Sequence, residues 1–152
     1  MTRRAVTNST CLIALGRINT LDLLPKVFAA ILAPPAVSTE FGIALDWLRV
    51  QAPSDDALVK ALATQLHAGE AEAIALAMEL GDATIILDDK KARRIASDLG
   101  LRVTGTLGVL VRAKRQGVVP AVKPLLDRLE TAGFYTNEPL REKALALARE
   151  AD

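Results

Sequence analysis

Five residues with oxygen-bearing side chains stand where strand-like and helix-like patterns meet along this 152-residue sequence. Asn8 follows the first strand-like run, and Asp88 and Asp89 follow the most apolar one. Glu40 falls in the first turns of the helix expected after the second strand, and Glu70 opens an alanine-rich helical stretch. Such oxygen donors, with no His or Cys among them, suit Mg²⁺ or Mn²⁺ and not zinc.

Carboxylates that share one site repel one another, so a divalent cation is expected to hold them together. A cation in such a cluster activates a water molecule and neutralises charge on a phosphate, which is the chemistry of phosphodiester hydrolysis. Water, and not a side chain, would then be the nucleophile. Each acid also has an ordinary structural explanation, because Asp89 suits a helix N-cap and Glu70 suits a helix first turn. The residues alone leave both interpretations open.

Alternating strand and helix patterns predict the scaffold that would bring these residues together. Because strands alternate with helices, we expect a three-layer α/β/α fold with a mostly parallel central sheet and a helical C-terminal extension. Ligands in such sheets bind beyond the carboxyl ends of the strands, where Asn8, Asp88 and Asp89 are predicted to lie. The expected strands cover residues 5–7, 30–33, 47–51, 84–87 and 101–103, and the last expected helices cover 107–115, 119–131 and 138–150.

Two local details follow from the same patterns. A short helical piece at 21–24 is expected to stop near Pro25, because proline removes a backbone donor. Glu72 lies two positions after Glu70, so on a helix the two face different directions, and Glu72 is expected on the surface.

The composition narrows the functional classes. Hydrophobic residues make up 51% and charged residues 24%, which is a globular balance. Nineteen basic and 18 acidic residues give a formal charge of +1, so nucleic acid would have to bind at a local patch. Aromatic residues are only 3%, which argues against a protein that binds single strands mainly by stacking. No apolar run reaches the roughly 20 residues of a membrane span, so we expect a cytoplasmic protein without a membrane partner.

Basic and hydroxyl residues beside the acids are candidate RNA contacts. Lys90, Lys91 and Arg93 follow the acid pair directly, and Ser9 follows Asn8. The three basic residues could hold phosphates, or they could form a solvated helix face. Ser9 could orient Asn8, and helix capping explains it equally well.

Several blocks of the sequence resemble the PIN-domain family, in the order in which that family has them. The run from Val6 to Ile13 looks like its opening strand and first helix, and 37–40 resembles its second acidic block. The stretches 69–77 and 85–93 resemble its third and fourth acidic blocks, and 105–110 looks like a prokaryotic PIN subgroup related to VapC-like toxins. The resemblance implies one PIN-like domain over 1–152, with a core at about 4–115 and C-terminal helices at about 116–150.

The resemblance also implies an activity, a metal-dependent ribonuclease that is the toxin of a toxin–antitoxin pair. Glu40, Glu70 and Asp89 would hold Mg²⁺ or Mn²⁺, with Asn8 as a further ligand and Asp88 assisting. Asn8 stands where the family usually has Asp, so it can offer an oxygen but no charge, and metal affinity should fall. A cognate antitoxin and a homodimer are the expected protein partners.

Two other functions fit parts of the pattern. The first is a catalytically weak or inactive PIN-like module that binds RNA or a protein without cleavage, which the Asn8 departure supports. The second is a phosphoacceptor receiver domain, and it fits less well because its acid pair should follow the first strand.

Overall fold

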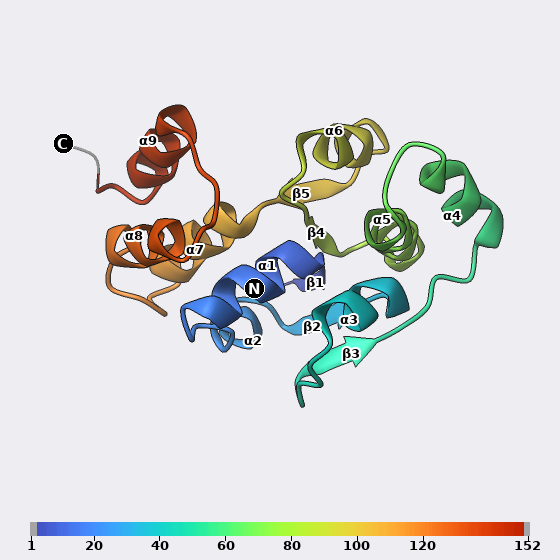
Figure 1. The fold of residues 1–152 in the computed structure, drawn as a ribbon, viewed down its shortest axis with the longest axis horizontal. Coiled ribbons are helices and arrows are strands. Elements are labelled where there is room, and N and C mark those ends of the chain that lie inside the picture. The colour runs from blue at the N-terminus through green and yellow to red at the C-terminus, as the bar shows by residue number, and fades with distance from the viewer. Residues whose placement is uncertain (1–2, 151–152) are drawn as a thin grey trace.

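The computed structural model describes residues 3–150, and these form one five-stranded sheet with helices on both of its faces (Figure 1). The predicted domain of 1–152 is longer, and residues 1–2 and 151–152 lie outside the described residues. The strands are β1 (Arg4–Thr7), β2 (Ala30–Ala33), β3 (Leu48–Val50), β4 (Thr84–Ile86) and β5 (Arg102–Thr104). The helices are α1 (Ser9–Arg17), α2 (Leu23–Val27), α3 (Pro35–Phe41), α4 (Asp56–Ala63), α5 (Ala68–Leu80), α6 (Lys90–Asp98), α7 (Thr106–Arg115), α8 (Lys123–Thr131) and α9 (Glu138–Leu147).

The sheet is parallel throughout and has the strand order β3-β2-β1-β4-β5. The chain runs from central β1 outward through β2 to β3, and then returns to β4 on the other side of β1. This reversal makes a crevice beyond the carboxyl ends of β1 and β4, which is where parallel sheets bind ligands. The predicted mostly parallel sheet is confirmed, and so is the extra strand expected within 47–51.

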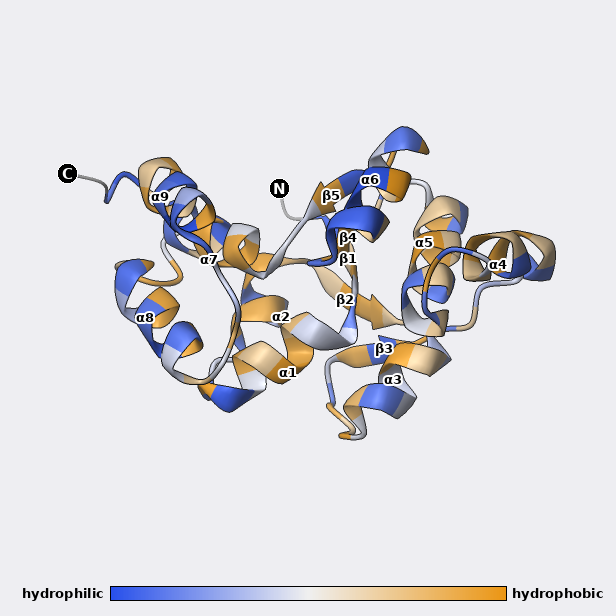
Figure 2. Ribbon diagram, turned by 45° about the horizontal axis from the view of Figure 1, so that its top comes forward, coloured by the Kyte–Doolittle hydropathy of each residue, from blue (hydrophilic) through white to orange (hydrophobic). Residues whose placement is uncertain are grey.

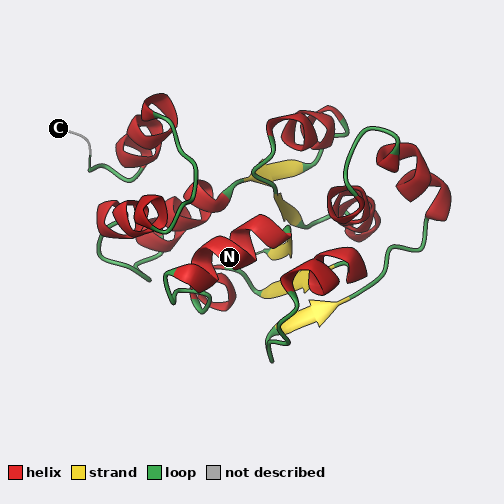
Figure 3. Cartoon of the chain, viewed as in Figure 1, coloured by secondary structure: helices red, strands yellow, loops and turns green. Residues whose placement is uncertain are grey.

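Alternation of side chains along the strands creates the two helix-covered faces of the predicted three-layer fold. Ala5 of β1 and Ile86 of β4 pack in one cluster with residues of α1, α2 and α7. Val6 and Ile85, their neighbours, pack in a second cluster with residues of α4, α5 and α6. Figure 3 shows the strands between these two groups of helices.

Helix α5 is covered by α3 and α4 as well as by the sheet, so its small residues are buried on more than one face. Ala71, Ala73, Ala75 and Ala77 are fully buried and pack with the second cluster. The helix ends at Gly81, whose left-handed φ of 77° a glycine adopts without steric cost. Figure 2 shows α6, in contrast, as largely hydrophilic. This packing sets Glu70, in the first turn of α5, at the carboxyl edge of the sheet.

The C-terminal helices contribute to the main core. Leu129 of α8 and Ala144 of α9 belong to the same buried cluster as residues of α1 and α7. The Glu150 carboxylate holds the segment after α9 against the start of α8, because it accepts hydrogen bonds from the backbone N–H groups of Val122 and Lys123. No helix within residues 3–150 is both long and apolar enough to cross a membrane.

Four predicted helix boundaries are wrong, and one of them is the end of α9, which lies at Leu147 and not at residue 150. Helix α2 continues through Pro25, which is tolerated because the N–H groups of a first turn have no partner within the helix. Helix α3 ends early at Gly42, whose φ is 79°, so Glu40 lies in its last turn and not its first turns. Helix α8 begins at Lys123 and not near residue 119, after a turn at Gly117, whose φ is 77°.

Candidate functional site

The carboxyl ends of β1 and β4 bring Asn8 and Asp88 together. The backbone N–H of Asn8 donates to the carbonyl of Ile86 at 3.2 Å, which extends the pairing of these strands by one residue. The side-chain Oδ1 of Asn8 accepts from the backbone N–H of Cys11 at 2.9 Å, so Asn8 is the N-cap of α1. Its Nδ2 donates to Oδ2 of Asp88 at 3.3 Å.

Asp88 is held by Thr106 as well as by Asn8. Oδ1 of Asp88 accepts from the backbone N–H of Thr106 at 2.8 Å, and Oδ2 accepts from the Thr106 hydroxyl at 2.8 Å. Thr106 is the first residue of α7 and is fully buried. Both oxygens of Asp88 therefore accept hydrogen bonds, and the carboxylate links the start of α7 to the ends of β1 and β4.

Cys11 lies beneath this pair, fully buried. Burial raises the pKa of its thiol to about 12, and the nearby Asp88 charge acts in the same direction. Cys11 is therefore held at neutral pH as the thiol, and the thiolate is the nucleophilic form of cysteine.

Asp89 points away from this pair and is the N-cap of α6. Its Oδ2 accepts from the backbone N–H of Ala92 at 2.9 Å, and the side chain is exposed. Lys90 and Lys91 are exposed in the first turn of α6. Arg93 lies on the inner side, and its Nη1 donates to the carbonyl of Leu87 at 2.7 Å.

Glu40 reaches the same edge from the last turn of α3. Its carboxylate accepts a hydrogen bond from the hydroxyl of Ser9, which is 8% exposed in the first turn of α1. Glu40 itself is exposed. This contact joins α1 to α3 and places Ser9 beside a carboxylate.

Glu70 lies within electrostatic range of Asp89 and Glu40. Partial burial raises the pKa of the Glu70 carboxyl above its ordinary value, and the charges of Asp89 and Glu40 raise it further. His67, the N-cap residue of α5, acts in the opposite direction through a backbone hydrogen bond and its charge. The ionised form of Glu70 is thus destabilised, as expected for a carboxylate among like charges.

The predicted residues form two groups at one edge. Asn8 and Asp88 are bonded to each other, whereas Glu40, Glu70 and Asp89 interact through their charges. Within residues 3–150 no three or more His, Cys, Asp or Glu side chains converge closely enough to hold a metal ion. The donor chemistry still fits a hard cation, since it consists of carboxylates whose charges oppose one another. Asn8 brings one amide oxygen that already accepts a hydrogen bond.

Sequence reasoning did not predict the contacts of three contributors to this edge. Thr106 was identifiable, because it follows the last strand and parallel strands end at one edge. Glu72 does more than cover a surface, since its carboxylate accepts from the backbone N–H of Ala36 at 3.1 Å and supports the start of α3. The third is a cavity of about 420 Å³ that Asp88 and Asp89 share with Phe134 and Tyr135. No local pattern pairs these segments.

Comparison with known proteins assigns the family. A PIN-domain family model, DUF3368, matches residues 4–150. The chain belongs to the PIN-domain family. PIN domains are generally nucleases and generally use divalent metals. The match covers nearly the whole chain and includes the residues of α8 and α9.

One solved structure is similar to this PIN domain in outline. It is a PilT N-terminus domain protein from the hyperthermophilic archaeon Sulfolobus solfataricus, 17% identical, with a TM-score of 0.41. The similarity covers 89% of this chain and 98% of that one. No curated protein sequence matches this chain.

Proposed function

We propose that this PIN domain is a Mg²⁺- or Mn²⁺-dependent endoribonuclease that hydrolyses RNA phosphodiester bonds. The observation that carries the proposal is the gathering of Glu70, Asp89 and Glu40 at the sheet edge, where partial burial and the charges of the other two carboxylates raise the pKa of Glu70. Three carboxylates that repel one another lose stability unless a cation is bound. A site that neutralises them with a divalent ion also neutralises phosphate charge.

Glu40, Glu70 and Asp89 would hold the ion, with the Asn8 oxygen as a further donor. When bound, the ion would lower the pKa of a coordinated water and stabilise charge on the phosphate. The chain's own residues position this chemistry. Ser9 orients Glu40, and the N-cap contact of Asp89 fixes its place on α6. Asp88 would contribute by positioning other residues, because its hydrogen bonds hold Asn8 and the start of α7 in place.

Candidate RNA contacts surround this edge. Lys90 and Lys91 are exposed beside Asp89 and are free to approach phosphates. Arg93 and Ser9 are engaged with Leu87 and Glu40, so their contribution would come mainly from shaping the edge. The further roles, as the toxin of a toxin–antitoxin pair that meets an antitoxin and forms a homodimer, rest on the resemblance to VapC-like proteins.

A second function is favoured by one contact. The Asn8 amide donates directly to Asp88, so this part of the edge is stable without a cation. A PIN domain that binds RNA or a protein without cleaving would have this property. Metal binding at the remaining acids separates the two functions.

The test is thermal unfolding in EDTA and in millimolar Mn²⁺. The wild type is compared with Glu40→Gln/Asp89→Asn and with a control pair of exposed acids, Glu142→Gln/Asp46→Asn. An ion at 100 times its Kd stabilises the native state by roughly 2.7 kcal/mol. For a chain of this size, that raises Tm by about 5–11 °C. We expect this shift in the wild type and the control pair, and its loss in the site variant.

Cleavage completes the test. A labelled single-stranded RNA pool should be cut in Mn²⁺ by the wild type and the control pair, and not by the site variant. Equal Mn²⁺ shifts in all three proteins would overturn the proposed metal site. A wild type with neither a shift nor cleavage would favour the non-cleaving module.

A further inference from the structure

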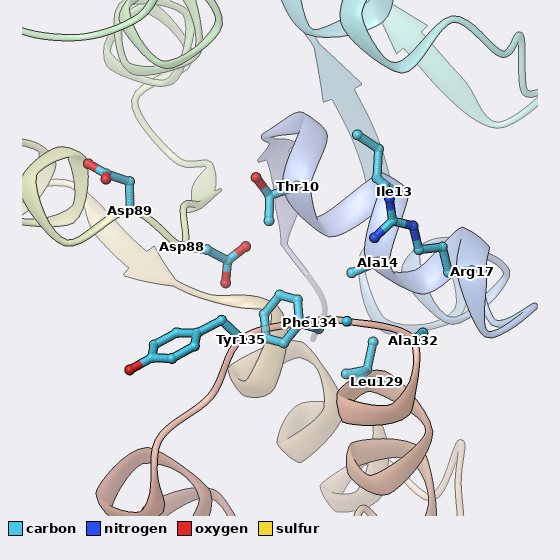
Figure 4. Close-up of a pocket in the computed structure, with 11 residues that line it drawn as sticks. Thr10, Ile13, Ala14, Arg17, Asp88, Asp89, Leu129, Ala132, Phe134 and Tyr135 are labelled. Atoms are coloured by element: carbon cyan, nitrogen blue, oxygen red, sulfur yellow. The ribbon is translucent and has the colours of Figure 1, made fainter.

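The cavity beside the acidic edge lies between α1, the end of β4 and the loop that joins α8 to α9. Figure 4 shows Asp88 and Asp89 on one side, Arg17 on the other, and the rings of Phe134 and Tyr135 between them and the α8–α9 loop. Its volume of about 420 Å³ is within the range of small-ligand sites, roughly 300–1,000 Å³. The acids belong to the site described above, whereas Arg17 and the two rings have no role in it.

The two rings are consecutive and differently supported. Phe134 is half-buried against the core, and its backbone N–H donates to the carbonyl of Leu129 at 2.9 Å, which fixes the loop. Tyr135 is 81% exposed. Only five of the 152 residues are aromatic, so the composition argues against extensive stacking, yet two of them meet beside the acids. An exposed ring on a fixed loop adds little to folding and offers a flat surface to a ligand.

Positive charge continues from this cavity along the seam between α1 and α8. A second cavity of about 350 Å³ shares Arg17 and Ala132 with the first, and it is also lined by Arg128 and by Asp127, whose charge is paired with Arg141. Both arginines are exposed, and none of the ion pairs found within residues 3–150 involves either of them. The two cavities thus lead from the carboxylates, past the two rings, to two guanidinium groups outside these ion pairs, and that of Arg128 donates to the carbonyl of Ile18.

We propose that this groove binds single-stranded RNA, with an unpaired base stacked on Tyr135 and Phe134 and a backbone phosphate paired with Arg17. Any base can stack on an aromatic side chain, so stacking tolerates different sequences. The planar guanidinium group of arginine can donate two parallel hydrogen bonds to phosphate oxygens. A duplex does not fit this mode, because its bases are already stacked. The inference rests on the proposed function, because it takes the neighbouring phosphate of the bound strand to lie at the acidic edge. Tyr135 and Arg17 are then positioning residues for the strand.

The test measures binding in EDTA, where no cleavage interferes. Fluorescein-labelled hexauridylate, an abasic strand of the same length and a duplex hairpin are titrated with the full chain, and anisotropy is followed at several salt concentrations. The variants are Tyr135→Ala, Tyr135→Phe and Arg17→Ala. Arg49→Ala is the matched control, because Arg49 is an exposed arginine on edge strand β3, outside both cavities. Each variant is first checked for an unchanged Tm.

We expect Tyr135→Ala to weaken hexauridylate binding by roughly tenfold, and Tyr135→Phe to restore it. The abasic strand should bind weakly and equally to the wild type and Tyr135→Ala, because it has no base to stack. Arg17→Ala should weaken both strands and reduce the salt-dependence slope by about 0.7, whereas Arg49→Ala should change neither. The hairpin should bind less tightly than hexauridylate.

Three results would overturn the inference. These are no hexauridylate binding by the wild type, unchanged binding by Tyr135→Ala, or an equal loss with the abasic strand. The response to Mn²⁺ separates this inference from the proposed function. If the wild type binds hexauridylate in EDTA and Tyr135→Ala binds it weakly, but no protein responds to Mn²⁺, the groove stands and the nuclease proposal fails. If Mn²⁺ stabilises the wild type but Tyr135 is irrelevant to binding, the reverse holds.

Discussion

The Nδ2 atom of Asn8 lies 3.3 Å from Oδ2 of Asp88, across the ends of two neighbouring parallel strands. Position 8 is where the resemblance to PIN domains leads one to expect an aspartate. With Asp at that place, two carboxylates would face each other and repel unless a cation lay near them. In this chain a neutral amide satisfies Asp88 directly, so the pair contributes to stability without an ion.

The variant Asn8→Asp should therefore lose stability in EDTA and regain it in Mn²⁺. The substitution replaces a hydrogen bond to a charged group by a repulsion, at a cost of roughly 1–3 kcal/mol. In EDTA we expect Tm to fall by about 2–4 °C for each kcal/mol lost. In millimolar Mn²⁺ the upward shift of Tm should exceed that of the wild type, because the site gains a negative ligand.

Asn137→Asp is the matched control for this change. Asn137 is the N-cap of α9 and accepts from the backbone N–H of Leu140 at 2.9 Å, as Asn8 does from Cys11. Aspartate caps a helix as well as asparagine does, so the control should keep its stability in EDTA and in Mn²⁺. If the two variants behave alike, the Asn8–Asp88 contact has no special electrostatic role.

The hydrogen bond from the Thr106 hydroxyl to Asp88 should also contribute to the free energy of unfolding. Thr106→Val keeps the shape of the side chain but removes a donor to Oδ2 of Asp88, so we expect a loss of about 1–3 kcal/mol in urea unfolding. Thr106→Ser keeps the hydroxyl and should lose less. Thr84→Val is the control, since the Thr84 hydroxyl is buried and has no hydrogen-bond partner within residues 3–150. It should be neutral or stabilising, and equal losses in the two valine variants would contradict the role of Thr106.

The fold could be predicted from the sequence because its signals are local. Apolar runs such as 84–87 fix the strands, and their alternation with helices fixes a parallel sheet. The end of each strand then gives Asn8 and Asp88 a common edge without further information. The predicted helix boundaries were wrong where a single backbone angle decides them. Gly42, for example, ends α3, so Glu40 lies in the last turn of that helix.

The finer site could not be predicted, because side-chain partnership depends on tertiary distance. In the sequence Asp88 and Asp89 are equivalent neighbours. In the structure Asp88 accepts hydrogen bonds from Thr106 and Asn8, whereas Asp89 caps α6. Successive residues after a strand point in opposite directions, and only the placed helices decide what each one meets. Phe134 and Tyr135 lie 45 or more positions from the acids in sequence, so only packing of α8 on α1 reveals their shared cavity.

The stability of the fold should depend on the ionisation of Glu70. The pKa of Glu70 is raised in the folded state above its ordinary value of 4.5, so the folded chain binds this proton more tightly than the unfolded chain. Stability therefore falls as pH rises from about 4.5 through the folded-state pKa, and the loss persists at neutral pH. Glu70→Gln removes this loss, so its Tm should exceed that of the wild type at pH 7 and match it below pH 4.

Glu142→Gln is the control for the Glu70 experiment, since Glu142 is an exposed glutamate on α9. Its Tm difference from the wild type should not change across the same pH series in EDTA. Added Mn²⁺ should reverse the order at pH 7, because the wild type gains a ligand that Glu70→Gln lacks. A Glu70→Gln difference that stays constant from pH 4 to pH 7 would show that neither burial nor like-charge repulsion raises the pKa of Glu70 in the folded chain.

Gly105 should be required for close packing of the β5–α7 turn against Asp88. A Cβ at this position would lie 2.8 Å from Nη1 of Arg93 and 3.0 Å from Oδ1 of Asp88. Its backbone, with φ of −115° and ψ of −176°, is extended and open to any residue, so the constraint is one of space alone. Gly105→Ala should therefore displace the Arg93 guanidinium or the Asp88 carboxylate from its hydrogen bond, at a cost of about 1–3 kcal/mol.

The size of that loss can be traced to its source with two further variants in urea unfolding. Arg93→Ala removes the nearer obstacle, so adding Gly105→Ala to it should cost less than adding it to the wild type, which is a positive coupling in a double-mutant cycle. Gly16→Ala is the matched control, since its Cβ would meet Leu21 at an ordinary 3.5 Å within helix α1. It should stabilise by roughly 0.5–1 kcal/mol through helix propensity. Additive losses in the cycle would show that Arg93 is not what excludes a side chain at Gly105, and that Asp88 or the turn itself sets the limit.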